Sequence, residues 1–111
     1  DIAVSIEDVF DKKIHALDAL ESQVYEGGAN GSAQIMRQRK ANDPVARKEI
    51  LKASWLGRNG RVADRFRGSL IKLYGTEGGK AVKTAEAFEL CEYGRRPSQA
   101  ELKELFPFFN K

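Results

Sequence analysis

Two short segments of strand character lie far apart in this chain, and most of the sequence between them has the pattern of helices. In the first, residues 2–6, apolar side chains occupy alternate positions (Ile2, Val4 and Ile6), and residues 86–93 form the second. Natural proteins avoid leaving the N–H and C=O groups of a strand edge unpaired, so each strand needs a neighbour. Unless the two strands pair with each other, they fit best as strands that complete a larger sheet belonging to sequence outside this chain.

Apolar residues at helical spacing and local start signals predict the other elements. One apolar stripe begins at Phe10, the Asp43-Pro44 pair is typical of a helix start, and Ser98 followed by Glu101 has the pattern of a capping box. The predicted helices cover residues 7–25, 32–41, 44–56, 61–74 and 98–106, with Gly57 and Gly60 interrupting the middle of the chain and Gly75 ending the fourth helix. The residues expected to face inward from the third helix are Val45, Ile50, Leu51 and Trp55. The expected fold is mostly α with two short strands, of the α/β class, in a single domain or domain fragment over residues 1–111.

Length and composition exclude several classes of protein. The 111 residues suffice for one core, and 41% hydrophobic with 32% charged residues is an ordinary globular mixture. No apolar run approaches the roughly 20 residues that span a membrane. Cys91 has no disulfide partner and is predicted to be a buried, unreactive thiol, which fits a reducing compartment and so a cytoplasmic protein. With His15 the only histidine, a classical zinc site built from this chain is not expected.

Charge is distributed unevenly along the chain. The net charge is −5 over residues 1–36, +7 over residues 37–67 and +1 over residues 68–111. The acidic start and the basic middle can attract each other within one fold, or the basic middle can bind an anionic partner such as nucleic acid. Trp55 and Phe66 lie on apolar stripes and are interpreted as core rather than as stacking platforms. The candidate basic surface consists of Arg37, Arg39, Lys40, Arg58, Arg61 and Arg65.

The chain holds few candidates for catalysis. His15 lies between Asp11 and Asp18 on one helix face, where the three could form a weak metal site or an acid–base pair; we interpret them as a solvated face instead. The glycine-rich segments lack the strand-then-helix context or the spacing of phosphate-binding loops. No Gly-x-Ser-x-Gly segment and no second histidine is present for a catalytic triad.

The order of several short motifs resembles the C-terminal part of the LmbE-like (PIG-L) family of zinc-dependent de-N-acetylases. A strand runs into Ile6-Glu7-Asp8-Val9-Phe10-Asp11-Lys12-Lys13-Ile14, and the helix that follows holds Ala19-Leu20-Glu21-Ser22-Gln23. Tyr74-Gly75, Ala85-Glu86-Ala87-Phe88-Glu89 and Glu92-Tyr93-Gly94 come later in the same order. One departure is clear, because family helices often carry a histidine before Ser-Gln where this chain has Leu20-Glu21.

The resemblance implies a Rossmann-like α/β fold in which zinc-activated water removes acetyl groups from N-acetylated sugars or glycolipids. The family's metal ligands come from a His-Pro-Asp-Asp-Glu motif and a later histidine motif, and neither occurs in this chain. The expectation is therefore a C-terminal structural portion without catalytic residues or cofactor of its own, with zinc needed only in the complete protein. Its partner would be the missing N-terminal catalytic portion or a second copy. Ser22, Gln23 and Glu86 match family positions and are assigned pocket-lining roles. The alternative is a small basic helical module that binds nucleic acid or another protein.

Overall fold

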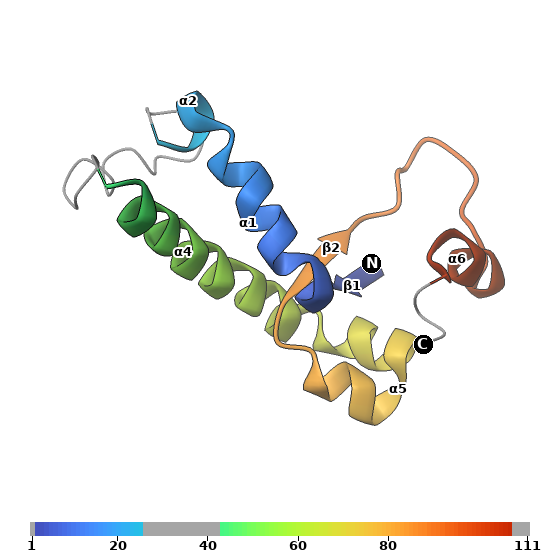
Figure 1. The fold of residues 1–111 in the computed structure, drawn as a ribbon. Coiled ribbons are helices and arrows are strands. Elements are labelled where there is room, and N and C mark those ends of the chain that lie inside the picture. Colours follow the sequence, from blue (N-terminus) through green and yellow to red (C-terminus); the bar gives the residue numbers. More distant parts are fainter. Residues whose placement is uncertain (1, 26–42, 108–111) are drawn as a thin grey trace. The chain divides into compact units, whose positions relative to one another are not determined.

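The computed structural model describes residues 2–25 and 43–107, and the predicted helix over residues 32–41 lies outside them (Figure 1). The chain divides into two compact units. We call Asp1–Glu7 with Asn59–Lys111 the strand unit, and Asp8–Arg58 the helical unit. Each is described by itself.

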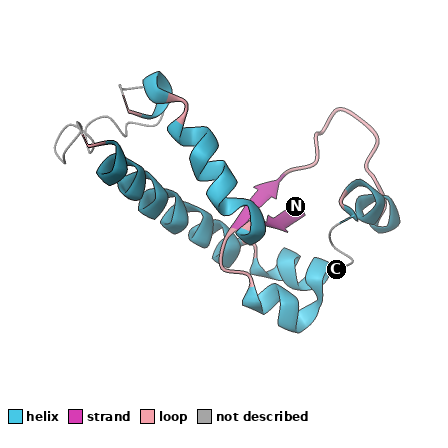
Figure 2. Cartoon of the chain, viewed as in Figure 1, coloured by secondary structure: helices cyan, strands magenta, loops and turns pink. Residues whose placement is uncertain are grey.

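The described residues are mostly helical, with two short strands, as the sequence predicts (Figure 2). In chain order the elements are β1 (Ile2–Ser5), a 3-10 turn (Glu7–Val9), α1 (Phe10–Asp18), α2 (Glu21–Val24), α4 (Pro44–Arg65), α5 (Arg67–Ala81), β2 (Ala85–Phe88) and α6 (Gln99–Leu105). Of these described helices, none combines the length and the apolar character that crossing a membrane requires.

The two strands pair with each other, which the sequence left open. β1 and β2 are antiparallel, with Ile2 opposite Phe88 and Ser5 opposite Ala85, and the Ile6 N–H donates to the Thr84 carbonyl at 3.1 Å. The predicted second strand over residues 86–93 is too long at its C-terminal end. In the described sheet, β2 ends at Phe88, which lies opposite Ile2.

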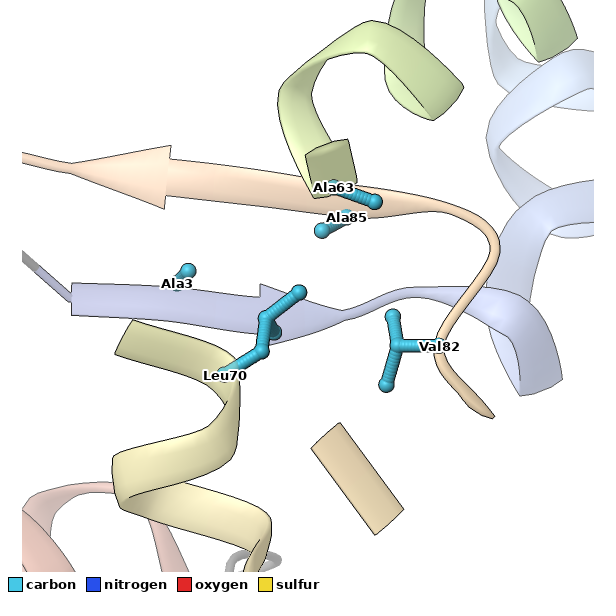
Figure 3. Packing of buried hydrophobic residues seen from close by; sticks show 5 residues of the cluster. All are labelled: Ala3, Ala63, Leu70, Val82 and Ala85. Carbon is cyan, nitrogen blue, oxygen red and sulfur yellow. The ribbon is translucent and has the colours of Figure 1, made fainter. Parts of the chain in front are cut away.

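The core of the strand unit covers both faces of this two-stranded sheet. One cluster joins the two strands to the end of α4 and to α5, and Figure 3 shows its five buried side chains. Its members are Ala3, Ala63, Leu70, Val82 and Ala85. On the other face, Ile2 and Val4 pack with Leu102 of α6. The alternation of side chains along β1 thus sends neighbouring residues into two separate clusters.

The capping box predicted at the start of α6 is confirmed. The Ser98 hydroxyl accepts from the Glu101 N–H, and the Glu101 carboxylate accepts from the Ser98 N–H at 2.7 Å. These bonds and the Arg95 guanidinium lower the pKa of the Glu101 carboxyl. A short helix of seven residues is marginal alone, so this cap and the burial of Leu102 together hold it.

α4 runs through both glycines that were expected to interrupt it. The predicted helices 44–56 and 61–74 are therefore wrong in their division, because the break falls at Phe66. A glycine within a helix costs only about 1 kcal/mol, which packing along a 22-residue helix outweighs. Leu51 is buried as predicted, whereas Val45 is 73% exposed because it lies in the first turn of α4.

The predicted helix over residues 7–25 is divided in the helical unit. α1 ends at Asp18, and α2 restarts at Glu21 after Leu20, whose ψ of 61° is not helical. Phe10, Ile14 and Val24 are buried, so the predicted apolar stripe is correct although the helix is not continuous.

α5 consists of two helical pieces that fold back on each other at Gly75. The φ of Gly75 is 78°, a conformation that favours glycine. After this reversal Gly79 passes directly over the first piece, where a Cβ on Gly79 would lie 2.4 Å from the Ile71 Cα and N. The Arg67 guanidinium then donates to the carbonyls of Gly79 (2.8 Å) and Val82 (2.6 Å). The predicted end of a helix at Gly75 is thus confirmed as a sharp reversal.

Gly79→Ala is expected to destabilise the strand unit by about 3 kcal/mol, because the added methyl meets backbone atoms that cannot move aside alone. Urea unfolding followed by circular dichroism measures this change. Gly68→Ala is the matched control, since its Cβ would meet no atom within 4 Å. The control should be neutral or slightly stabilising, and equal losses in both variants would contradict the close-approach explanation.

Candidate functional site

The strand unit contains a groove of about 740 Å³. Its walls come from three consecutive parts of the chain and from β2: the last turns of α4, the Phe66 turn, the first turn of α5, and the strand with the residue after it. The lining residues are Val62, Arg65, Phe66, Gly68, Ser69, Ala87, Phe88 and Glu89. Residues on both sides of the helix break at Phe66, Arg65 and Ser69 among them, thus line the same groove as β2.

The groove is lined by both apolar and polar side chains. It combines apolar walls with one guanidinium, one hydroxyl and one carboxylate, and it contains no histidine or cysteine. Arg65 stacks over the Phe66 ring at 5.5 Å and has no carboxylate partner among the described residues. The neighbouring Asp64 is bonded to Arg67 at 2.9 Å instead. Arg65 is therefore available to an anionic group in the groove.

None of the three residues predicted to line a pocket is among the residues that line this groove. Ser22 and Gln23 are exposed on α2 in the helical unit. Glu86 is half-buried on β2, opposite Val4, and side-chain alternation directs it away from the face of Ala85 and Ala87. Its sequence neighbour Ala87 lines the groove. The pocket-lining roles of Ser22, Gln23 and Glu86 stay predictions.

The groove residues were mostly missed by the sequence reasoning, apart from Arg65. Ser69 and Glu89 carry no motif, and Phe88 was assigned to strand only. No local sequence signal marks the groove, because its lining residues come from the end of α4, the start of α5 and β2, which only the fold brings together.

The basic segment is divided between paired and unpaired side chains. In the helical unit, Arg47 bonds Glu21 at 2.8 Å, Lys48 lies 3.5 Å from Asp18, and Lys52 bonds Asp11 at 2.7 Å. The acidic start and the basic middle therefore attract each other within this unit, as one of the two interpretations held. Arg58 stacks on Trp55 at 4.9 Å, and Arg61 and Arg65 are exposed one turn apart on α4. Arg37, Arg39 and Lys40 lie outside the described residues.

Asp18 contacts both a tyrosine hydroxyl and a lysine. The Tyr25 hydroxyl donates to its Oδ1 at 2.6 Å, and this bond, followed by the charge of Lys48, lowers the pKa of the Asp18 carboxyl. Burial and the same bond raise the pKa of Tyr25. A hydrogen bond from Lys52 lowers the pKa of Asp11.

His15 and Cys91 differ from what the sequence suggested in different ways. The His15 Nδ1 lies 2.8 Å from the Lys48 Nζ, which can only donate, so this ring nitrogen accepts. The face with Asp11 and Asp18 is thus ion-paired and not merely solvated.

Cys91 was expected to be buried, but it is exposed, because β2 ends before it. Within the described parts of the chain, no three His, Cys, Asp or Glu side chains lie together as a metal site would need.

Comparison with known proteins adds no relative: no protein-family model, no curated protein and no solved structure matches the chain.

Acid is expected to weaken the helical unit through Asp11 and Asp18. Their pKa values lie below the ordinary 3.8 in the folded chain, so their contribution is complete above about pH 4 and is lost as the pH falls through the lowered values. Asp18→Asn should cost about 1 kcal/mol at pH 7 and markedly less near pH 2. Unfolding followed by the fluorescence of Trp55, the single tryptophan, measures this, with the exposed Asp8→Asn as the control. A cost for Asp18→Asn that is the same at both pH values would contradict the assignment.

Proposed function

We propose that this chain is the C-terminal structural portion of a zinc-dependent deacetylase of N-acetylated sugars or glycolipids, with the metal centre in sequence outside the chain. The observation that carries the proposal is the pairing of β1 with β2. The two segments that bear the resemblance, the one that leads from β1 through Ile6 into α1 and Ala85-Glu86-Ala87-Phe88, are distant in sequence and adjacent in the sheet. Ala85–Phe88 is also the full extent of β2.

The described residues do not fit zinc, and no catalytic step is assigned to them. They include no metal-holding group, and the groove holds no histidine. In the proposed role, the chain supplies sheet and packing surface, and the zinc ligands come from elsewhere in the complete protein. Ser22, Gln23 and Glu86 keep their proposed pocket-lining roles in that complete protein.

The coding sequence on both sides of these residues tests the proposal first. We expect an upstream segment with a His-Pro-Asp-Asp-Glu motif. The purified longer protein should hold zinc, release acetate from N-acetylglucosamine-containing substrates and lose this activity on chelation. The 111-residue chain alone should hold no stoichiometric zinc and release no acetate. Acetate release by the chain alone, or a longer protein without such a motif, would refute the proposal.

Nucleic-acid binding is the second candidate, and the exposed Arg61 and Arg65 favour it. The pairing of Arg47, Lys48 and Lys52 with acids counts against a continuous basic surface. We therefore expect no saturable binding of a labelled 20-base duplex or single strand in fluorescence anisotropy at 150 mM salt. Binding that weakens steeply with added salt, and that Arg61→Ala with Arg65→Ala reduces, would make this the leading function.

A further inference from the structure

We infer that the outer edge of β2 pairs with an extended, acidic segment from the catalytic portion of the complete protein, seated in the groove between β2 and α4–α5. The inference rests on the proposed function for the source of that segment. The edge itself follows from the register of the two strands.

Hydrogen-bond alternation fixes which backbone groups of β2 point away from β1. The Ile6 N–H donates to the Thr84 carbonyl, so Ile6 and Thr84 form a hydrogen-bonded pair. In an antiparallel ladder such pairs alternate with non-bonded ones, which makes Val4–Glu86 and Ile2–Phe88 the other bonded pairs. The N–H and C=O groups of Ala85 and Ala87 therefore point outward from β2, as those of Ala3 and Ser5 do from β1.

Two observed side-chain bonds agree with this assignment and show what covers each edge. On the β1 side, the Ser5 N–H donates to the Tyr74 hydroxyl at 3.0 Å, and Ala3 is fully buried, so α5 closes that edge. On the β2 side, the buried Asn59 amide donates to the Ala85 carbonyl at 3.0 Å. The outer edge is thus occupied at Ala85.

Ala87 is the open position on the β2 edge. It is half-buried, it lines the groove, and none of the described residues bonds its outward N–H or C=O. The N–H and C=O groups of one residue on a strand edge are complementary to the backbone of another extended segment, which can bond both groups at once. The Asn59 bond at Ala85 sets where such a pairing must end.

Charge in the groove selects the kind of segment. The groove is lined by one guanidinium, Arg65, and one carboxylate, Glu89. Arg65 forms no ion pair with a described carboxylate, and the neighbouring Asp64 bonds Arg67. A carboxylate on the incoming segment would complement Arg65 in a partly desolvated wall beside Phe66. An extended segment with an acidic side chain therefore satisfies the edge and the arginine together.

Hydrogen exchange of backbone amides tests the edge residue by residue. In the 111-residue chain, the Ala87 amide should exchange fast while those of Glu86 and Phe88, bonded to β1, are protected. In the complete protein, the Ala87 amide should exchange at least about tenfold more slowly, with Glu86 and Phe88 still protected. Fast exchange at Ala87 in the complete protein would overturn the inference, as would concentration-dependent protection in the chain alone, which would place a second copy on the edge.

Ala87→Pro removes the outward N–H and leaves the inward pairs intact, a position where a strand tolerates proline. Glu92→Pro, at an exposed position beyond β2, is the matched control. In the complete protein, Ala87→Pro and Arg65→Glu should each increase exchange through the segment that covers the edge by about tenfold or more, and the control should not. If no segment responds to either variant, the inference is wrong.

Acetate release and zinc content are scored separately, so protection at Ala87 without deacetylation refutes only the proposed function. Deacetylation without protection of the Ala87 amide refutes only the inferred pairing at the β2 edge.

Discussion

The reversal inside α5 is the constraint on which the strand unit depends. Gly79 has to be glycine because its backbone passes against Ile71 with no room for a methyl, and Arg67 then bonds the carbonyls that end the second helical piece. These carbonyls would otherwise lack partners at a helix terminus, where a positive charge is also favoured by the helix dipole. The last of them belongs to Val82, only three residues before β2. The position of the strand therefore follows from a contact made at the first residue of α5.

Different interactions stabilise each of the two units internally. In the strand unit, small side chains let backbones approach closely, since three of the five residues in the main cluster are alanines. In the helical unit, α1 and α2 meet α4 through a series of ion pairs, most of them solvent-accessible. Pairs of this kind contribute only about 0–1 kcal/mol each and are weakened by salt, whereas close apolar packing is not. Phe10, Ile14 and Leu51 supply the buried apolar surface that the ion pairs alone do not provide.

What the sequence predicted well are features with local causes. The capping box at Ser98, the reversal at Gly75 and the apolar stripe from Phe10 each arise from residues within one or two turns. The errors arose where distant residues decide. Gly57 and Gly60 were expected to interrupt a helix, but Gly60 lies against the Lys83 backbone in the folded chain and α4 continues through it. The exposure of Cys91 likewise was not predicted, because β2 ends at Phe88 and the predicted strand continued through Cys91. The groove could not be predicted from the sequence for the same reason, because it forms only when the Phe66 turn and β2 come together.

Within the described residues, the features that bear on the proposed function are a groove and a strand edge. Several of its described carboxylates are used in ion pairs or in the cap of α6, its histidine bonds a lysine, and the groove presents backbone groups, an arginine and a glutamate. A two-stranded sheet of four-residue strands is stable here because helices cover both faces and one edge. On the remaining described edge, a further strand adds hydrogen bonds at Ala87, whereas Asn59 already bonds the Ala85 carbonyl. Pairing at Ala87 would convert the smallest possible sheet into part of a larger one. That outcome connects the resemblance to zinc deacetylases with a specific backbone position, and it requires no catalytic residue from this chain.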